Sequence, residues 1–216
     1  MSEVGTRTRG EDRSHRDPIL NPRRWPHGQN VVPHPRMDLS DFAEISLEER
    51  DLLYHLTFTA IHGDLANLGH AGGASAITMA RAILDRGFGR SSVVESVDLF
   101  TSAAHWGGSR RRLVLYGVRQ IVNPCRGYTK EWGEKFTAEG RRFAGIFIDA
   151  DHTYVSVVED SNLWRPLCHP GGWVAFHDTH QDFSHKAIEE TIEKDTSFKE
   201  AKELHVDSIR VFRRAV

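Results

Sequence analysis

Two short apolar runs, each ending abruptly in acidic and histidine residues, constrain the fold of this chain more than any other feature. The first run spans residues 146–148, and a predicted helix and a Pro-Gly-Gly turn separate it from the second run, residues 173–176. Two buried strands that are joined by a helix lie parallel, so their carboxyl ends meet at one edge of the sheet. Open α/β sheets bind their ligands at that edge. We therefore expect one active site, formed by the side chains that follow the two runs: Asp149, Asp151, His152, His177, Asp178 and His180.

A strand, a glycine-containing loop and a helix open the predicted sheet. Residues 64–69 read as the first core strand, the loop continues as HAGGAS, and residues 76–84 form a helix rich in Ala, Ile, Met and Leu. Glycine lets the backbone turn tightly and approach a ligand without interference from a Cβ atom. This order is typical of nucleotide-binding Rossmann-like sheets, although a glycine turn between a strand and a helix also occurs for structural reasons alone.

Asp98 ends the next predicted strand, residues 92–97. An acidic residue at this position, about 20 to 30 residues after the glycine loop, is placed to bind the hydroxyls of a ribose. An isolated Asp would equally be a helix cap or a surface carboxylate, but the glycine loop upstream favours ribose binding. A third strand over residues 121–124 brings Gly127 and Tyr128 to the same edge, where Tyr128 would stack on an aromatic base or join the core.

The N-terminal part of the chain divides into an arm and the start of the domain. Residues 1–36 combine arginine and proline with almost no apolar periodicity, which predicts a flexible arm. An alternative is an arm that folds over the active site or a partner subunit, with Trp25 as an anchor. Residues 37–216 form a single domain, in which Ser46 and Glu49 have the spacing of a capping box and predict a helix near the mouth of the site.

The remaining segments complete the predicted order of elements. Residues 100–112 are rich in Gly, Ser and Arg and read as a loop, and residues 113–118 read as the end of a helix. Residues 186–194 have the apolar spacing of a helix. The last segment, residues 202–216, contains two extended runs about a turn at residues 206–208, which predicts a closing hairpin.

Composition and charge limit the classes of function. A formal net charge of -2 argues against a dedicated nucleic-acid-binding protein, which is usually basic. The two cysteines have no CxxC spacing, so we expect a reducing, cytoplasmic environment. No apolar run approaches the roughly 20 residues that span a bilayer, so we expect no membrane partner. The Arg-rich start lacks the apolar segment of a secretory signal.

The motifs together resemble the class I S-adenosylmethionine-dependent methyltransferases. The specific part is the pair IDADHTY (residues 148–154) and PGGWVAFHDT (residues 170–179), which is similar to a small family with the motif I-D-x-D-H-x-Y. The resemblance covers about residues 60–216. It implies an α/β fold, namely a Rossmann-like, mostly parallel seven-stranded sheet with helices on both faces and a C-terminal antiparallel hairpin. Several relatives methylate sugar hydroxyls, and the Arg/Pro-rich start is similar to mycobacterial O-methyltransferases of methylmannose polysaccharide synthesis.

The implied activity is O-methylation of a sugar or oligosaccharide hydroxyl, with S-adenosylmethionine as cofactor and a mannoside as one candidate acceptor. This chain departs from the family pattern at Asn67, where an acidic residue usually ends the first strand. The resemblance places the methionine end of the cofactor at the glycine loop, its ribose at Asp98 and its adenine along Gly127 and Tyr128. The implied cofactor-binding residues are Asn67, Gly69, His70, Gly73, Ser75, Asp98, Gly127, Tyr128 and Asp149.

The resemblance also implies a divalent metal ion, Mg²⁺ or another, held by Asp149, Asp178 and Thr179. Threonine is a weaker ligand than a carboxylate, and Asp151 or His180 would complete the shell. A histidine beside the acceptor hydroxyl would take its proton, with His152 as the first candidate and His177 and His180 next. The alternative role of each is to orient a carboxylate. The candidate catalytic set is His152, Asp149 and His180.

Three other functions stay open. An NAD-dependent oxidoreductase would use a similar sheet, but the loop GHAGGAS lacks the GxGxxG spacing. A metal-dependent hydrolase would use the Asp and His clusters and leave Asp98 without a role. A non-catalytic scaffold would explain why Asn67 and Thr179 depart from the pattern. A homodimer is expected only because it is the commonest soluble assembly.

Overall fold

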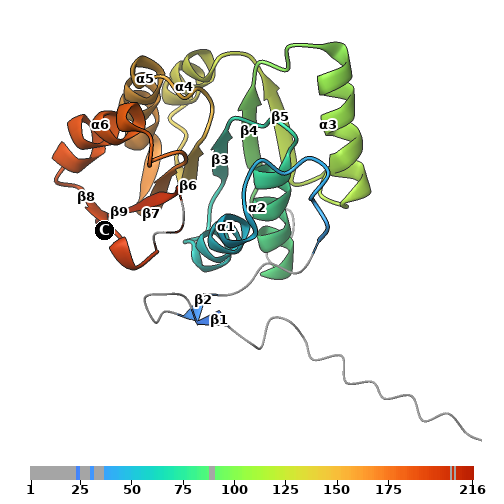
Figure 1. Ribbon diagram of the computed structural model, residues 1–216, viewed down its shortest axis with the longest axis horizontal. Coiled ribbons are helices and arrows are strands. Elements are labelled where there is room, and N and C mark those ends of the chain that lie inside the picture. Colours follow the sequence, from blue (N-terminus) through green and yellow to red (C-terminus); the bar gives the residue numbers. More distant parts are fainter. Residues whose placement is uncertain (1–22, 25–29, 32–36, 88–90, 205, 207) are drawn as a thin grey trace, which may run out of the picture.

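A seven-stranded sheet with the strand order β5-β4-β3-β6-β7-β9-β8 forms the centre of the molecule (Figure 1). The computed structural model describes residues 23–24, 30–31, 37–87, 91–204, 206 and 208–216. The neighbouring strands β5, β4, β3, β6 and β7 run parallel, and β9 lies antiparallel to both β7 and β8. The strands of the sheet are β3 (Leu65–Leu68), β4 (Val94–Asp98), β5 (Val122–Arg126), β6 (Phe143–Ile148), β7 (Cys168–Phe176), β8 (Phe198–Glu200) and β9 (Arg210–Arg214).

Six helices cover the two faces of the sheet within the described part of the chain (Figure 1). One apolar cluster joins the sheet to the first three helices, and a second cluster joins its other face to the last three. Burying a large apolar side chain completely contributes about 1.5–3 kcal/mol, so these two clusters dominate stability. The helices are α1 (Leu47–Thr59), α2 (Ala74–Asp85), α3 (Ala103–Leu115), α4 (Thr129–Ala138), α5 (Tyr154–Trp164) and α6 (Asp182–Glu190). The predicted sheet, with helices on both faces and a C-terminal antiparallel pair, is confirmed.

The strand register places the candidate residues at one edge. Leu68 of β3 pairs with Val97 of β4 on one side and with Ile148 of β6 on the other. Ile148 in turn pairs with Phe176 of β7. Four parallel strands therefore end at one level, and the side chains that follow them meet there. The chain order reverses between β3 and β6, which is where open α/β sheets bind ligands.

The capping box that opens α1 is confirmed. The Ser46 side chain accepts a hydrogen bond from the Glu49 backbone N–H at 3.2 Å, and the Glu49 carboxylate accepts one from the Ser46 N–H at 2.7 Å. Each bond satisfies a backbone donor that the helix itself leaves open. The apolar side of α1 then packs against α2 and the sheet.

Three sequence predictions are wrong in detail. Residues 103–112, expected as a loop, belong to α3, which the Ser102 side chain caps by accepting from the His105 N–H. The Pro-Gly-Gly turn lies within β7, where a register shift against β6 leaves a bulge that tolerates these residues. In the hairpin, β8 comes before residue 202, and Lys202–Leu204 form a 3-10 turn instead of an extended run.

The N-terminal arm lies mostly outside the described residues. Its described parts are β1 (Arg23–Arg24) and β2 (Asn30–Val31), which pair antiparallel. The predicted anchor Trp25 is outside the described residues. No helix among the described residues is both long and apolar enough to cross a bilayer.

Candidate functional site

The glycine loop begins at Gly69, directly after β3. Gly69 has a φ of +90°, and a Cβ atom there would lie 1.9 Å from the carbonyl oxygen of Asp149. Only glycine allows the loop to cross the end of β6 this closely. The loop and the end of β6, which the sequence places far apart, therefore share one wall of the site.

Asp98 fixes this loop from the neighbouring strand. Its Oδ2 atom accepts hydrogen bonds from the backbone N–H groups of His70 at 3.0 Å and Ala71 at 2.9 Å. Its Oδ1 atom accepts from the Phe100 N–H at 2.8 Å. Ala71 and Phe100 both have positive φ, a conformation that costs free energy in residues other than glycine and is frequent at functional sites. The Asp98 carboxylate thus sets the shape of the loop as well as lining the cavity beside it.

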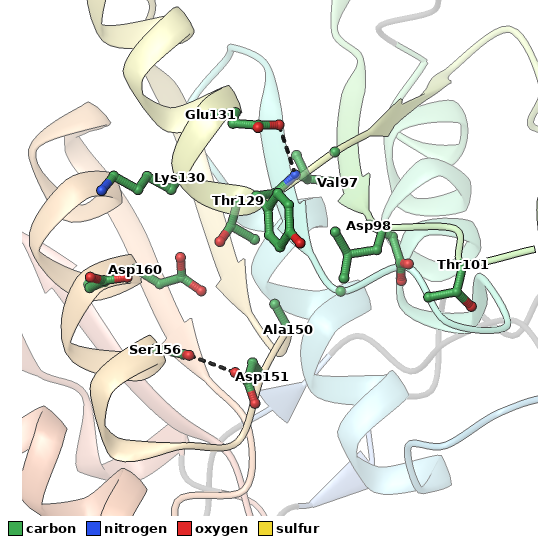
Figure 2. A pocket seen from close by; sticks show the side chains of 15 residues that line it. Val97, Asp98, Thr101, Thr129, Lys130, Glu131, Ala150, Asp151, Ser156 and Asp160 are labelled. Carbon is green, nitrogen blue, oxygen red and sulfur yellow. Dashed lines mark hydrogen bonds between the residues drawn. The ribbon is translucent and has the colours of Figure 1, made fainter.

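A cavity of about 570 Å³ opens between the loop, β5 and α5 (Figure 2). Cofactor sites commonly have this size. Asp98 and Thr101 lie on one side, and Asp160, Ser156 and Asp151 come from the side of α5 and the loop before it. The cavity is also lined by four predicted cofactor residues, which are Gly69, Asp98, Gly127 and Tyr128.

Asp160 also lines this cavity, although no sequence motif points to it. The residue is only 4% exposed, and it lines the cavity beside Thr129 (Figure 2). Burial raises its pKa to about 6, and a hydrogen bond with the Thr129 side chain acts in the opposite direction. No ion pair joins it to a cation among the residues that the structure describes. A buried carboxylate facing a cavity without a cation is suited to accept hydrogen bonds from a ligand's N–H groups.

The other predicted cofactor residues lie around the loop. His70, Ser75 and Asp149 line a smaller pocket together with Gly69 and residues of the 42–45 segment. Asn67 lies beneath the loop, where its Nδ2 donates to the Gly69 carbonyl and the Ser96 hydroxyl, each at 2.8 Å. Asn67 and Gly73 line neither of these two pockets. The hydrogen bond from Asn67 to the Gly69 carbonyl therefore supports the loop from below.

The His70 ring is a buried support for the same loop. Its Nδ1 lies 2.7 Å from the Ser96 hydroxyl and its Nε2 lies 2.5 Å from the Ser109 hydroxyl. Burial lowers the pKa of His70 to about 4, so the ring is neutral at physiological pH. A neutral ring with both nitrogens occupied positions the loop and is not available as a base.

The two polar clusters at the ends of β6 and β7 meet as predicted. One ligand atom from each of Asp149, His152 and Asp178 lies within 4.8 Å of the others. His152 Nδ1 is 3.0 Å from Asp178 Oδ2. Asp178 has a φ of +53°, another strained backbone at this edge. Two carboxylates and one imidazole at this spacing are a donor set that a divalent cation can use.

His177 lies behind this cluster, between two carboxylates. Its Nδ1 is 3.0 Å from Asp149 Oδ1, and its Nε2 is 3.2 Å from Glu49 Oε1 of α1. Burial alone would lower its pKa, but the contacts with Asp149 and Glu49 outweigh burial and raise the pKa to about 10. The ring is therefore an imidazolium at neutral pH. For Asp149, burial raises the pKa and the contact with His177 opposes the rise.

The remaining predicted residues lie at the border of the cluster. Thr179 is buried, and its hydroxyl donates to the Ser208 carbonyl at 2.8 Å. That bond ties the loop after β7 to the start of β9. Asp151 Oδ2 accepts from the Ser156 hydroxyl at 2.6 Å and faces the cavity of Figure 2. His180 is exposed, and within the described part of the chain no ion pair joins it to Asp149 or Asp178.

Several solved structures of similar fold are O-methyltransferases. TomG from Streptomyces achromogenes, an O-methyltransferase of tomaymycin synthesis in complex with SAM, is 18% identical, with 83% of this chain and 84% of TomG covered and a TM-score of 0.65. An O-methyltransferase from Bacillus cereus in complex with SAH is 16% identical, with coverages of 86% and 84% and a TM-score of 0.62. CalS11, a TDP-rhamnose 3'-O-methyltransferase of calicheamicin biosynthesis, is 16% identical, with both coverages 76% and a TM-score of 0.60.

At these identities the likeness establishes the fold. No curated protein matches the chain. Residues 66–179, which contain the glycine loop, Asp98, Asp149, His152 and Asp178, match the protein family described as a methyltransferase domain. This match covers more than half of the chain, so the chain belongs to that methyltransferase family.

Proposed function

We propose that this protein is an S-adenosylmethionine-dependent O-methyltransferase that acts on a hydroxyl of a sugar or of another small natural product, assisted by a divalent cation. The observation that carries the proposal is the position of the cavity. It is lined by the glycine loop and Asp98 at one end, and by Ala150 and Asp151, which directly follow the candidate metal ligand Asp149, at the other. The cavity therefore adjoins the cluster, and Gly69, Asp98, Gly127 and Tyr128 would hold the cofactor beside it. Two observations support a sugar as the acceptor: the similar fold of CalS11, a TDP-rhamnose 3'-O-methyltransferase, and the I-D-x-D-H-x-Y motif.

The reaction is a single displacement at the methyl carbon, so the main task of the protein is to hold the reacting atoms in line. Positioning of this kind contributes about 7–11 kcal/mol. The hydroxyl must also lose its proton during attack. His152 is suited to take it, because Asp178 holds its Nδ1 and orients the ring with Nε2 away from that contact.

The residues at the cluster fit a divalent cation. Asp149 and Asp178 supply carboxylate oxygens. The single positive charge of the nearby His177 ring offsets only one of these two carboxylates, so the cluster stays negative. A bound cation would lower the pKa of a coordinated hydroxyl and orient it. His152 is kept as the base in this proposal, so Asp149 and Asp178 are the groups that would hold the cation. The Thr179 hydroxyl, which is bonded to the Ser208 carbonyl, is the weakest member of the predicted ligand set.

Calorimetry with S-adenosylhomocysteine, in EDTA and in Mg²⁺ or Mn²⁺, tests the cofactor. A methyl-transfer screen against nucleotide sugars, methyl mannosides and oligosaccharides then tests the acceptor. Absence of S-adenosylhomocysteine binding contradicts the proposal as a whole. Binding without transfer to any acceptor would favour the non-catalytic scaffold.

Asp98→Ala is expected to weaken S-adenosylhomocysteine binding about tenfold to hundredfold. The variant loses the carboxylate that accepts from the loop N–H groups and that would accept from a ribose hydroxyl, and one hydrogen bond to a charged acceptor contributes about 1.5–3 kcal/mol. Calorimetry measures the affinity, and circular dichroism checks that the fold is retained. Asp41→Ala removes an exposed carboxylate and serves as the control. Unchanged affinity in Asp98→Ala would remove Asp98 from the cofactor site.

Asp160→Asn is expected to change which purine the cavity accepts. The carboxylate would accept a hydrogen bond from the 6-amino group of adenine and would repel the 6-oxo group of S-inosylhomocysteine. Wild-type protein should therefore prefer the adenosyl compound by roughly tenfold or more, and the variant, whose amide can donate to the oxo group, should lose most of this preference. Calorimetry with both compounds provides the measurement. An equal loss of affinity for both would mean that Asp160 only supports Thr129.

A further inference from the structure

Glu49 reaches the reaction centre from a part of the chain that precedes the matched methyltransferase region. It lies in the first turn of α1 and is only 4% exposed. Residues 66–179 match the family, so α1 lies outside that region. A buried carboxylate is costly unless it is paired, and its partners therefore indicate what it does.

Three groups contact this carboxylate. Oε2 accepts a hydrogen bond from the Ser46 N–H at 2.7 Å, and Oε1 accepts one from the Ser208 hydroxyl at 2.7 Å. Oε1 also lies 3.2 Å from His177 Nε2. The first contact belongs to the capping box and the second ties α1 to the segment before β9. Only the third points toward the chemistry.

We propose that Glu49 is a positioning residue of the reaction centre: it holds the His177 ring, which in turn holds the carboxylate of Asp149. The two ring nitrogens contact the two carboxylates, 3.2 Å away at Glu49 and 3.0 Å away at Asp149. Rotation of the ring would move at least one nitrogen away from its carboxylate. This inference rests on the proposed function for the role of Asp149, but the geometry it invokes can be measured separately.

The arrangement also manages charge. Asp149 and Asp178 lie close enough to repel each other when no cation is bound. His177 Nδ1 is 3.0 Å from one and 3.6 Å from the other, so the ring keeps both carboxylates together. Glu49 stabilises the ring in that place from the opposite side. His152 also lies at the cluster, and it faces Asp178 and not Glu49.

Glu49→Gln separates this role from the capping box. Glutamine can accept from the Ser46 N–H and keep the capping box, but it puts a neutral amide in place of the carboxylate that faces His177 Nε2. The charged partner of His177 is therefore lost while the helix start is kept. Ser46→Ala is the matched control, because it removes the side-chain cap of α1 and leaves the Glu49 carboxylate in place.

The experiment compares full-length wild type, Glu49→Gln and Ser46→Ala, using crystal structures of each with S-adenosylhomocysteine and titrations with Mn²⁺ followed by electron paramagnetic resonance. In Glu49→Gln we expect the His177 ring to leave Asp149, Mn²⁺ affinity to fall at least tenfold, and S-adenosylhomocysteine affinity to stay within twofold. With an acceptor from the screen, kcat should fall and the cofactor KM should not change. Ser46→Ala should lower the melting temperature and keep the ring and the Mn²⁺ affinity.

A Glu49→Gln protein whose His177 ring stays on Asp149 overturns the proposal, as does a Ser46→Ala protein that loses Mn²⁺ as strongly as Glu49→Gln. If wild type binds S-adenosylhomocysteine and no Mn²⁺, the metal part of the proposed function fails, and the crystal structures alone decide the role of Glu49. If wild type binds neither, the proposed function fails, and the position of the ring in structures of the free proteins still decides the positioning claim.

Discussion

Asp149→Asn is expected to abolish methyl transfer, lowering kcat by about a thousandfold or more, and Asp178→Asn should do the same. Each variant removes one anionic ligand from the cluster and one of the three carboxylates around the His177 ring. Metal binding and turnover should therefore be lost together. Initial rates with radiolabelled S-adenosylmethionine over a range of Mg²⁺ and Mn²⁺ concentrations provide the measurement.

Asp182→Asn is the control for this pair, since Asp182 is an exposed carboxylate in the first turn of α6. It should keep both activity and the response to metal. If Asp149→Asn is as active as wild type, or if EDTA leaves the wild-type rate unchanged, the cation has no part in the reaction.

His152→Ala is expected to lower kcat by about 10²–10⁴-fold, which is the usual contribution of a general base. The affinity for S-adenosylhomocysteine should stay the same, because His152 contacts Asp178 and does not line the cofactor cavity. A base must be unprotonated to act, so the wild-type rate should fall toward acid pH and the variant should lose that fall. Rates measured across pH 5–9 test both points.

His185→Ala provides the matched control for this substitution. His185 is an exposed histidine on α6 that pairs with Glu189 four residues later. Its removal should change neither the rate nor the pH profile. A His152→Ala protein with the wild-type pH profile would assign the proton transfer to another group.

The sequence predicts the centre of the fold because the relevant signals are local and agree with each other. The strand, glycine loop and helix around Gly69 are read from neighbouring residues, and the parallel crossover alone places Asp149 and Asp178 at one edge. The capping box of Ser46 and Glu49 is likewise a pattern within four residues. Each of these features has a physical cause that does not depend on the rest of the chain.

The wrong details have causes that lie outside the segment concerned. Residues 103–112 contain two glycines and three arginines, which favour a loop by propensity, but Ser102 caps the helix and Leu113 anchors it in the core. The Pro-Gly-Gly segment is tolerated in β7 only because β7 bulges out of its pairing with β6 there. Neither the cap nor the bulge can be deduced from apolar periodicity.

The missed site residues have the same explanation. Glu49 fits its capping box so well that its pattern gives no sign of a second partner, and that partner, His177, is distant in the sequence. Asp160 lies in the middle of a helix, where an acidic residue ordinarily faces solvent. Only the packing of α5 against the cavity reveals that it is buried. Long-range contacts of this kind need the assembled sheet.

The strand order also has a consequence for how the chain folds. β3 pairs with β4, which follows soon after it in the chain, and with β6, which follows only after β4, β5 and two further helices. Closing the longer loop costs more conformational entropy, so β3, β4 and β5 should associate first, both in refolding and on the ribosome. The hydrogen bonds between Asp98 and the glycine loop form within this group of strands, which associates first. The wall that α5 adds to the cofactor cavity comes later, and the loop after Asp178 becomes fixed only when the Ser208 carbonyl accepts the hydrogen bond of Thr179. The ribose side of the cavity therefore takes shape before the place for the chemistry.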